Sequence, residues 1–184
     1  MPLGLVNAPC KVTVSKESSQ AADTLVAQNI LKMYSRMPAA NRARAVWLIN
    51  QDVEPQLLNL NITFRDIVGS AGIAAGAAAY LPPGGLSGSP YATLMGRPIL
   101  PTEACGTVGD LGDIVFVDLG AYLTAVKSGG NGLGIKSDVS MHLWFDQGAT
   151  AFRFTMRMAG RPWLSAPIAR KNGSNTLSPV VVLE

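Results

Sequence analysis

Apolar residues recur every three or four positions near the start of the chain. They lie at Ala22, Leu25, Val26, Ile30, Met33, Tyr34 and Met37. This spacing is typical of one face of a helix. Ser18 or Ser19 can cap the helix, and Pro38 ends it. The pattern predicts a helix over residues 18–37, which would be the longest element of the chain and its spine.

Short apolar runs predict strands, with a strand end or extended lead-in at residues 11–14. The runs cover residues 11–14, 45–50, 97–104, 113–118, 121–126, 166–170 and 179–183. The nearly continuous run 45–50 is typical of a strand that is buried on both faces. Prolines flank the run at 97–104, which predicts a position at a sheet edge. Between the runs, Asn50 or Asp52 can cap a short helix that buries Leu57, Leu58 and Leu60. The pattern therefore predicts an α+β chain.

Two later runs alternate strictly between apolar and polar residues. The first has Val139, Met141, Leu143 and Phe145 as its apolar positions, and the second has Phe152, Phe154, Met156 and Met158. The turn residues 146–149 separate them. We therefore expect an antiparallel pair with one core face and one polar face that carries Arg153 and Arg157.

A long segment without charge lies between the predicted helices and the later strands. Residues 69–90 contain six Gly, six Ala, three Ser and three Pro, and no charge occurs from Ile67 to Gly96. The apolar part, residues 67–81, is shorter than the roughly 20 residues of a membrane-spanning helix. We interpret residues 67–90 as a loop used in an interaction.

Composition adds a hint of assembly. The chain has 184 residues, of which 48% are hydrophobic and 15% charged, and its formal net charge is +3. This composition is sufficient for a hydrophobic core. The mean hydropathy of +0.23 is high for a soluble monomer. We therefore expect apolar surface that is covered by other subunits. The first nine residues lack the features of a secretory signal, which predicts synthesis in the cytoplasm.

Residues for catalysis or metal binding are sparse. Cys10 and Cys105 lie 95 positions apart, and His142 is the sole histidine. This excludes tetrahedral metal spacing and paired redox cysteines. Residues 129–137 combine Gly, Lys and Ser without the spacing of a phosphate-binding loop. We expect no catalytic residue, no cofactor and no metal site, and hence no enzyme.

Five blocks of the sequence carry a family resemblance. They are TVSKESSQAADTLVAQNILKM, AVWLINQDVEPQL, LPPGGLSGSPYATLMGRPILPTEA, GDIVFVDLGAYL and TAFRFTMRMAGRPW. In this order and spacing they resemble the C-terminal half of the major capsid proteins of tailed bacteriophages and prophages, which have the Hong Kong 97 fold. The resemblance covers residues 12–183.

The resemblance implies two domains. A peripheral domain would comprise residues 1–37 and 135–165, with the spine helix at 18–37 and nearby β-strands. An axial domain with the central sheet would comprise residues 38–134 and 166–184. The loop 67–90 would then point toward the centre of a capsomer. Relatives also have an N-terminal arm and an extended hairpin loop before the spine helix, and we expect this chain to lack both.

The implied function is that of a structural subunit. It would self-associate into pentameric and hexameric capsomers of an icosahedral virion shell that contains DNA, assembled in the bacterial cytoplasm. Without arm and hairpin, we expect at most weak capsomer-like rings. Predicted partners are copies of the chain, a missing N-terminal capsid half, a scaffold or portal, and non-specific DNA at the inner surface; no membrane is expected. Candidate subunit-interface residues are Tyr80, Leu81, Pro82, Pro83, Arg153 and Arg157.

Two alternatives from another class stay open. The tail beyond Gly148 carries five cations, among them Arg153 and Arg157, against Glu184 as its only acidic residue. A basic sheet of this kind could bind nucleic acid. The uncharged loop 67–90 could instead insert into a membrane.

Overall fold

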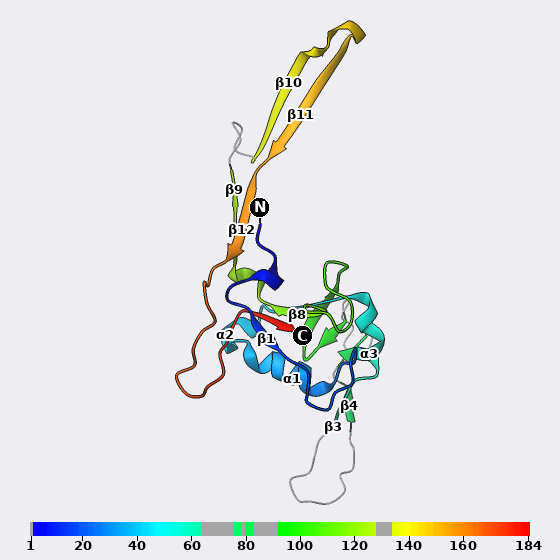
Figure 1. The fold of residues 1–184 in the computed structure, drawn as a ribbon, viewed down its shortest axis with the longest axis vertical. Helices are drawn as coiled ribbons and strands as arrows, with labels where there is room; N and C mark the ends of the chain where they lie inside the picture. The colour runs from blue at the N-terminus through cyan, green and yellow to red at the C-terminus, as the bar shows by residue number, and fades with distance from the viewer. Residues whose placement is uncertain (1, 64–75, 79, 83–91, 128–133) are drawn as a thin grey trace, which may run out of the picture.

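The computed structural model describes residues 2–63, 76–78, 80–82, 92–127 and 134–184. Figure 1 shows that a narrow two-stranded ribbon projects from the rest of the molecule. We call residues 122–162 the stalk and the other described residues the body. The C-terminus lies at the sheet of the body, whereas the N-terminal residues run up beside β12, Met158–Pro162 (Figure 1).

A seven-stranded sheet organises the body. Its order is β1-β13-β8-β2-β7-β6-β5. The bounds are β1 Val12–Val14, β2 Val46–Ile49, β5 Tyr80–Leu81, β6 Thr93–Leu94, β7 Arg97–Pro101, β8 Ile114–Val117 and β13 Val180–Leu183. Most neighbours are antiparallel, but β1 runs parallel to β13 and β2 runs parallel to β7. These strands confirm the predicted α+β fold with a central sheet.

The centre of the sheet matches the apolar runs in the sequence. Every residue of β8 and of β13 is buried, as expected for strands with apolar side chains on both faces. The prediction that residues 97–104 lie at a sheet edge is wrong. The two short strands β5 and β6 extend the sheet beyond β7, and Pro98 lies opposite Thr93 of β6. Strand β7 contains two prolines and still has neighbours on both sides. Its neighbour β6 is only two residues long and pairs with Arg97 and Pro98 alone.

The helix is shorter than the sequence predicts. It is α1, Ala27–Arg36, and residues 18–26 form turns and irregular backbone. Two hydrogen bonds from a distant side chain explain the late start: Gln56 donates to the Asp23 carbonyl (2.9 Å) and accepts from the Leu25 amide (2.6 Å). Asp23 also has a φ of +55°, which is incompatible with a right-handed helix. The Asn29 side chain then accepts from the Val26 amide (3.1 Å).

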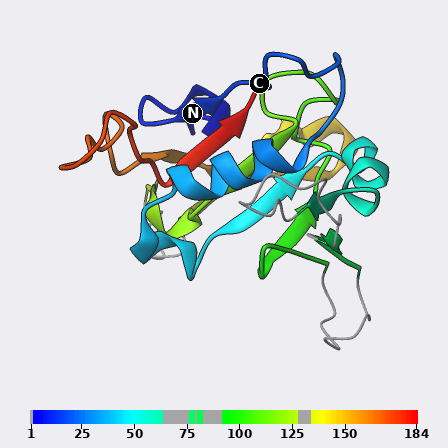
Figure 2. The ribbon, with the colours of Figure 1, turned by 90° about the horizontal axis from the view of Figure 1, so that it is seen from below.

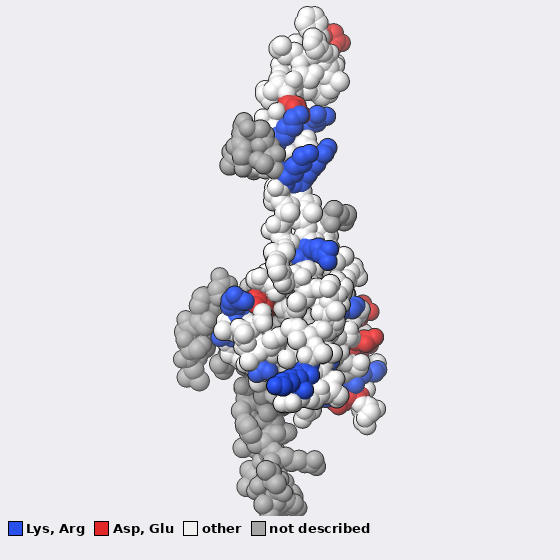
Figure 3. All heavy atoms as spheres, turned by 90° about the vertical axis from the view of Figure 1, so that its left-hand side faces the viewer, with Lys and Arg blue, Asp and Glu red and all other residues white. Residues whose placement is uncertain are grey.

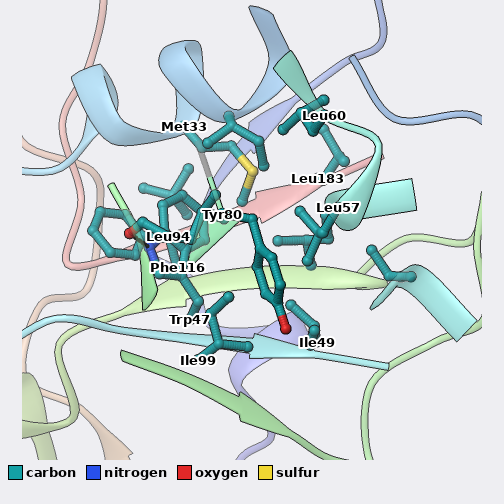
Figure 4. Close-up of a cluster of buried hydrophobic side chains, with 14 of the residues drawn as sticks. Met33, Trp47, Ile49, Leu57, Leu60, Tyr80, Leu94, Ile99, Phe116 and Leu183 are labelled. Carbon is teal, nitrogen blue, oxygen red and sulfur yellow. Dashed lines mark hydrogen bonds between the residues drawn. The ribbon is translucent and has the colours of Figure 1, made fainter. Parts of the chain in front are cut away.

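Helix α1 covers one face of the sheet, as Figure 2 shows. Its buried residues Ile30 and Met33 join the main core. In that core the Trp47 ring stacks on Phe116, with 4.0 Å between ring centroids (Figure 4). The Trp47 indole nitrogen donates to the Leu94 carbonyl at 3.0 Å, so its polar atom is satisfied inside the core.

The opposite face of the sheet has a second apolar cluster. The 3-10 helix η1, Leu5–Asn7, contributes Leu5, and the following residues contribute Ala8 and Cys10. They pack with Cys105 and with residues of β8 and β13 such as Val117. Because both faces are covered, the sheet has its apolar residues inside the body.

Short elements connect the strands. They are α2 Ala39–Arg42, η2 Gln51–Val53, α3 Glu54–Leu58, β3 Asn61–Thr63 and β4 Gly76–Ala78. Asn50 confirms its predicted role as a cap by accepting from the Asp52 amide at 3.1 Å. Leu57 is buried as expected, whereas Leu58 is 60% exposed, so its predicted burial is wrong.

The predicted loop 67–90 contains short strands where the structure describes it. Strand β4 pairs with β3, and β5 pairs with β6. The prediction of an unstructured loop is therefore wrong for residues 76–78 and 80–81. The remaining part of the segment, apart from Pro82, lies outside the described residues.

The two predicted domains share one sheet in the body. Strand β1 from the segment 1–37 pairs with β13 from the segment 166–184. Helix α1 rests on the same two strands. The assignment of residues 1–37 and 135–165 to a peripheral domain, and of 38–134 and 166–184 to an axial domain, stays a prediction.

Candidate interaction surface

Two successive β-ladders form the stalk. Nearest the body, β9 (Tyr122–Val126) pairs with β12 (Met158–Pro162). Farther out, β10 (Ile135–Trp144) pairs with β11 (Ala149–Met156). A ten-residue strand is about 33 Å long, so the outer ladder carries its turn far from the body (Figure 1). The predicted antiparallel pair is thus confirmed.

The register of the outer ladder separates apolar from polar side chains. On one face Ile135 lies opposite Met156, Ser137 opposite Phe154, and Val139 opposite Phe152. On the other face Lys136 lies opposite Thr155, Asp138 opposite Arg153, and Ser140 opposite Ala151. Directly opposite residues point to the same side of a ladder. The outer ladder is therefore an amphipathic ribbon.

The apolar face of this ribbon is open to solvent. Phe152 is 65% exposed and Phe154 is 71% exposed. Ile135, Val139 and Met156 are also exposed. The prediction that this face packs on the core of the same chain is therefore wrong. Alternation of this kind is typical of a strand with one buried face, but no described residue of this chain covers the face.

An ionic cluster occupies the polar face. Asp138 accepts from the Arg153 guanidinium at 2.9 Å and lies 2.9 Å from the Lys136 ammonium. The hydrogen bond from Arg153, followed by that from Lys136, lowers the pKa of the Asp138 carboxyl. The cluster is solvent-exposed, so it orders the side chains of this face with little effect on stability.

The stalk carries the net charge of the whole protein. Its charged residues are Lys127, Lys136, Arg153, Arg157 and Arg161 against Asp138 and Asp146. These give +3, and ten cations balance ten anions in the rest of the chain. Figure 3 shows the cations gathered along the stalk. The predicted candidates Arg153 and Arg157 are both exposed there, and Arg153 is already paired with Asp138.

The predicted interface residues of the body are arranged differently. Tyr80 is buried in the main core, and its hydroxyl lies 3.3 Å from a Glu54 carboxylate oxygen. Burial, and then the charge of Glu54, raise the pKa of this hydroxyl. Tyr80 is thus a core residue of its own subunit, and its part in contact with another copy stays a prediction. Pro82 is exposed, Leu81 belongs to β5, and Pro83 lies outside the described residues.

The inner end of the stalk is fixed by a brace that the sequence did not reveal. The Leu3 amide donates to the Gly160 carbonyl at 2.8 Å, and the Tyr122 hydroxyl donates to the Leu3 carbonyl at 2.7 Å. A Cβ atom on Gly160 would lie 2.6 Å from the Tyr122 ring, so only glycine fits there. These residues are far apart in sequence, and no local pattern indicates their contact.

The groups considered for chemistry are not arranged as a catalytic site. Both Cys10 and Cys105 are buried, free thiols. Burial, and then the charge of Asp113, raise the pKa of Cys105, which keeps it in the unreactive thiol form. His142 lies in the exposed strand β10. Within the described ranges, no three His, Cys, Asp or Glu side chains gather in a way that could hold a metal ion.

Together these features define an α+β protein with a sheet-based body and a projecting ribbon whose apolar face is exposed. The family is shown by sequence: the model of the phage capsid family matches residues 1–172. The chain therefore belongs to the phage capsid family, as the sequence blocks indicated. No curated protein matches it significantly.

Solved structures share the fold. The capsid of an empty gene transfer agent (GTA) particle, computed with C5 symmetry, is 16% identical with a TM-score of 0.57. The capsid of the native GTA particle is 17% identical with a TM-score of 0.56. Each match covers 99% of this chain and 55% of the other. The chain thus spans just over half the length of these capsid proteins.

Family and fold together indicate a structural, non-enzymatic protein that is a component of a virion-type particle. Among the described residues, no helix combines the length and the apolar character needed to cross a membrane.

Proposed function

We propose that this chain is a self-associating subunit of an icosahedral phage-type shell, and that the apolar face of β10–β11 forms the contact between copies. The observation that carries the proposal is the exposure of this face, with Phe152 and Phe154 at its centre. A two-stranded ribbon is marginally stable alone in water. A covering surface would bury its apolar side chains and stabilise the ladder.

The size of the face fits a subunit contact. Ile135, Val139, Met141, Phe152, Phe154 and Met156 form or continue it, and all are exposed. With roughly 100 Å² still accessible on each side chain, they offer on the order of 600 Å². A stable protein interface buries about 800 Å² on each partner. The face therefore supplies most of one side of a standard interface.

A second copy is the partner that the comparisons favour. The GTA capsids that share the fold belong to particles computed with C5 symmetry. Symmetry lets one surface make the same contact many times, so modest contacts accumulate into a stable shell. We also infer a location in the virion, assembly in the bacterial cytoplasm, and packaged DNA, a scaffold, a portal and an N-terminal capsid half as further partners.

The test compares two apolar-to-polar substitutions at exposed sites. Phe154→Ser alters the proposed contact, whereas Leu58→Ser alters α3 on the body, where the leucine is similarly exposed. Light scattering as a function of concentration would measure assembly of each variant and of the unsubstituted chain. We expect Phe154→Ser to shift the protein to monomer and Leu58→Ser to assemble like the unsubstituted chain. At concentrations where all three proteins are monomeric, the unfolding midpoints should be unchanged in both variants.

The outcomes are distinct. Ring-like oligomers that dissociate in Phe154→Ser alone would support the proposal. An unsubstituted chain that is monomeric at all concentrations, or equal assembly of all three proteins, would refute the role of this face.

A further inference from the structure

A pocket of about 240 Å³ lies where the stalk joins the body. Leu123 of β9, Trp163, Leu164 and Ile168 form much of its lining, with Gly120. Trp163 is 69% exposed, and Leu123 and Ile168 are exposed as well. The pocket is thus an apolar depression whose walls come from segments on both sides of the stalk.

The far end of the stalk carries an apolar projection. The 3-10 helix η4, Phe145–Gln147, closes the turn between β10 and β11. Phe145 is 80% exposed, more than any other large apolar side chain among the described residues. A cavity of about 150 Å³ holds a benzene molecule, so the pocket is large enough for the Phe145 ring.

Charge at the two places is complementary. Asp146 is the only charged residue between Asp138 and Arg153, so the tip is acidic. At the pocket, the Arg44 guanidinium carbon lies 3.7 Å from where a Cβ on Gly120 would be. The Arg44 side chain is exposed although it pairs with Asp118 at 2.9 Å. Arg44 is thus an exposed cation close to the pocket, paired with Asp118, and its charge is opposite in sign to that of Asp146 at the tip.

We propose that Phe145 of one copy occupies the pocket beside Trp163 of the next copy, with Asp146 facing Arg44. The proposal rests on the proposed self-association and names the surfaces that meet. The pocket is lined by Leu123 of β9 and by residues that follow β12, at the inner end of the stalk. In Figure 1 the turn between β10 and β11 lies at the outer end, so one chain cannot join tip and pocket within itself. Such a contact is head-to-tail, and head-to-tail contacts close into rings when the rotation permits.

Cysteine crosslinking tests the contact directly. Gln147→Cys places a thiol beside Phe145, and Ser165→Cys places one next to the pocket residue Leu164. The two single variants are mixed and treated with a short bismaleimide. We expect a crosslinked dimer from the mixture. The control replaces Ser165→Cys with Ser35→Cys, an equally conservative change at an exposed position of α1, and should give no dimer. The unsubstituted chain measures the background from Cys10 and Cys105.

A second measurement keeps the proposal falsifiable. Phe145→Ala should weaken association by about tenfold, as expected for the loss of one well-packed interface side chain, whereas Phe145→Leu should largely restore it. Crosslinking of Gln147→Cys with itself, or equally with Ser35→Cys, in protein that still assembles would overturn the docking and leave self-association intact. A failure of every variant to associate, the unsubstituted chain included, would overturn both.

Discussion

The body and the stalk use the same kinds of residues with opposite results. Trp47 and Phe116 in the body are fully buried and stacked. Phe152 and Phe154 in the stalk lie on a ribbon of equally regular strands, yet most of their surface is exposed. The main sheet of the body has seven strands with apolar clusters on both faces, whereas the outer ladder has two strands and no covering layer among the described residues.

An apolar face in the sequence thus predicts that the face is buried, but it does not predict whether the same chain or another copy covers it. Within the body the cover is α1 on one side and η1 with its following residues on the other. For the stalk, our proposal assigns the cover to another copy. Substitutions in the body should therefore change folding, while those in the stalk should change association.

The largest expected effect is in the main core. Trp47→Ala removes a fully buried indole, its stacking on Phe116 and its hydrogen bond to Leu94. We expect a loss of about 3–5 kcal/mol in the free energy of unfolding, measured by urea denaturation. Should this variant fail to fold, Ile49→Val should still cost about 0.5–1.5 kcal/mol. A similar loss in Phe154→Ala would break the comparison, because that side chain is exposed in the monomer.

A smaller effect, with a pH signature, is expected at the end of β8. Asp118 is buried and accepts hydrogen bonds from Asn41 (2.6 Å), Arg44 (2.9 Å) and the Gly120 amide (2.9 Å). Burial opposes its ionisation, but these donors outweigh burial and hold its pKa below the ordinary value. Asp118→Asn should cost about 1.5–3 kcal/mol at neutral pH, because a charged acceptor is lost.

The sign of the pH dependence follows from the lowered pKa. The stabilisation by Asp118 is present above the unfolded-state pKa of about 3.9 and is lost as the pH falls through the lower folded-state pKa. Urea denaturation at a series of pH values below 5 should therefore bring the unsubstituted protein and Asp118→Asn together. A constant difference down to pH 2 would contradict the role assigned to this carboxylate.

The smallest effect is expected on the polar face of the stalk. Arg153→Gln removes the guanidinium that pairs with the exposed Asp138. Exposed ion pairs contribute little to stability, so the unfolding midpoint should not change measurably. Light scattering should show assembly like that of the unsubstituted chain. Loss of assembly in Arg153→Gln together with normal assembly in Phe154→Ser would move the interface to the polar face. DNA binding that falls steeply with salt in the unsubstituted chain alone would favour the nucleic-acid alternative.

Local pattern predicted most of the strands and failed where distant groups intervene. The apolar runs around Trp47 and Phe116 became strands β2 and β8, since continuous apolar sequence suits a strand covered on both faces. The helix began late because Gln56 binds the backbone of residues 23–25 from more than 30 positions away. The periodicity of residues 18–37 cannot predict a hydrogen bond from a side chain so far away in the sequence.

The candidate surface was predictable only in part, because local pattern does not show how distant segments are arranged. Alternation placed Phe152 and Phe154 on one face of an antiparallel pair, and the register confirms this. It could not show that the pair projects beyond the body. Tyr80 was expected at an interface because the family resemblance directs the loop 67–90 toward the capsomer centre, and within the single chain its aromatic ring lies in the core. The pocket brings together residues near positions 41, 121, 164 and 179, an arrangement that only the fold specifies.

The brace at Leu3, Tyr122 and Gly160 makes the stalk a lever. With an arm of about 33 Å in the outer ladder alone, a rotation of about 10° at the root would carry the turn at Phe145 by about 6 Å. The residues that precede β1 therefore set the direction of the stalk. A small displacement of Leu3 would produce a larger displacement of the turn at Phe145.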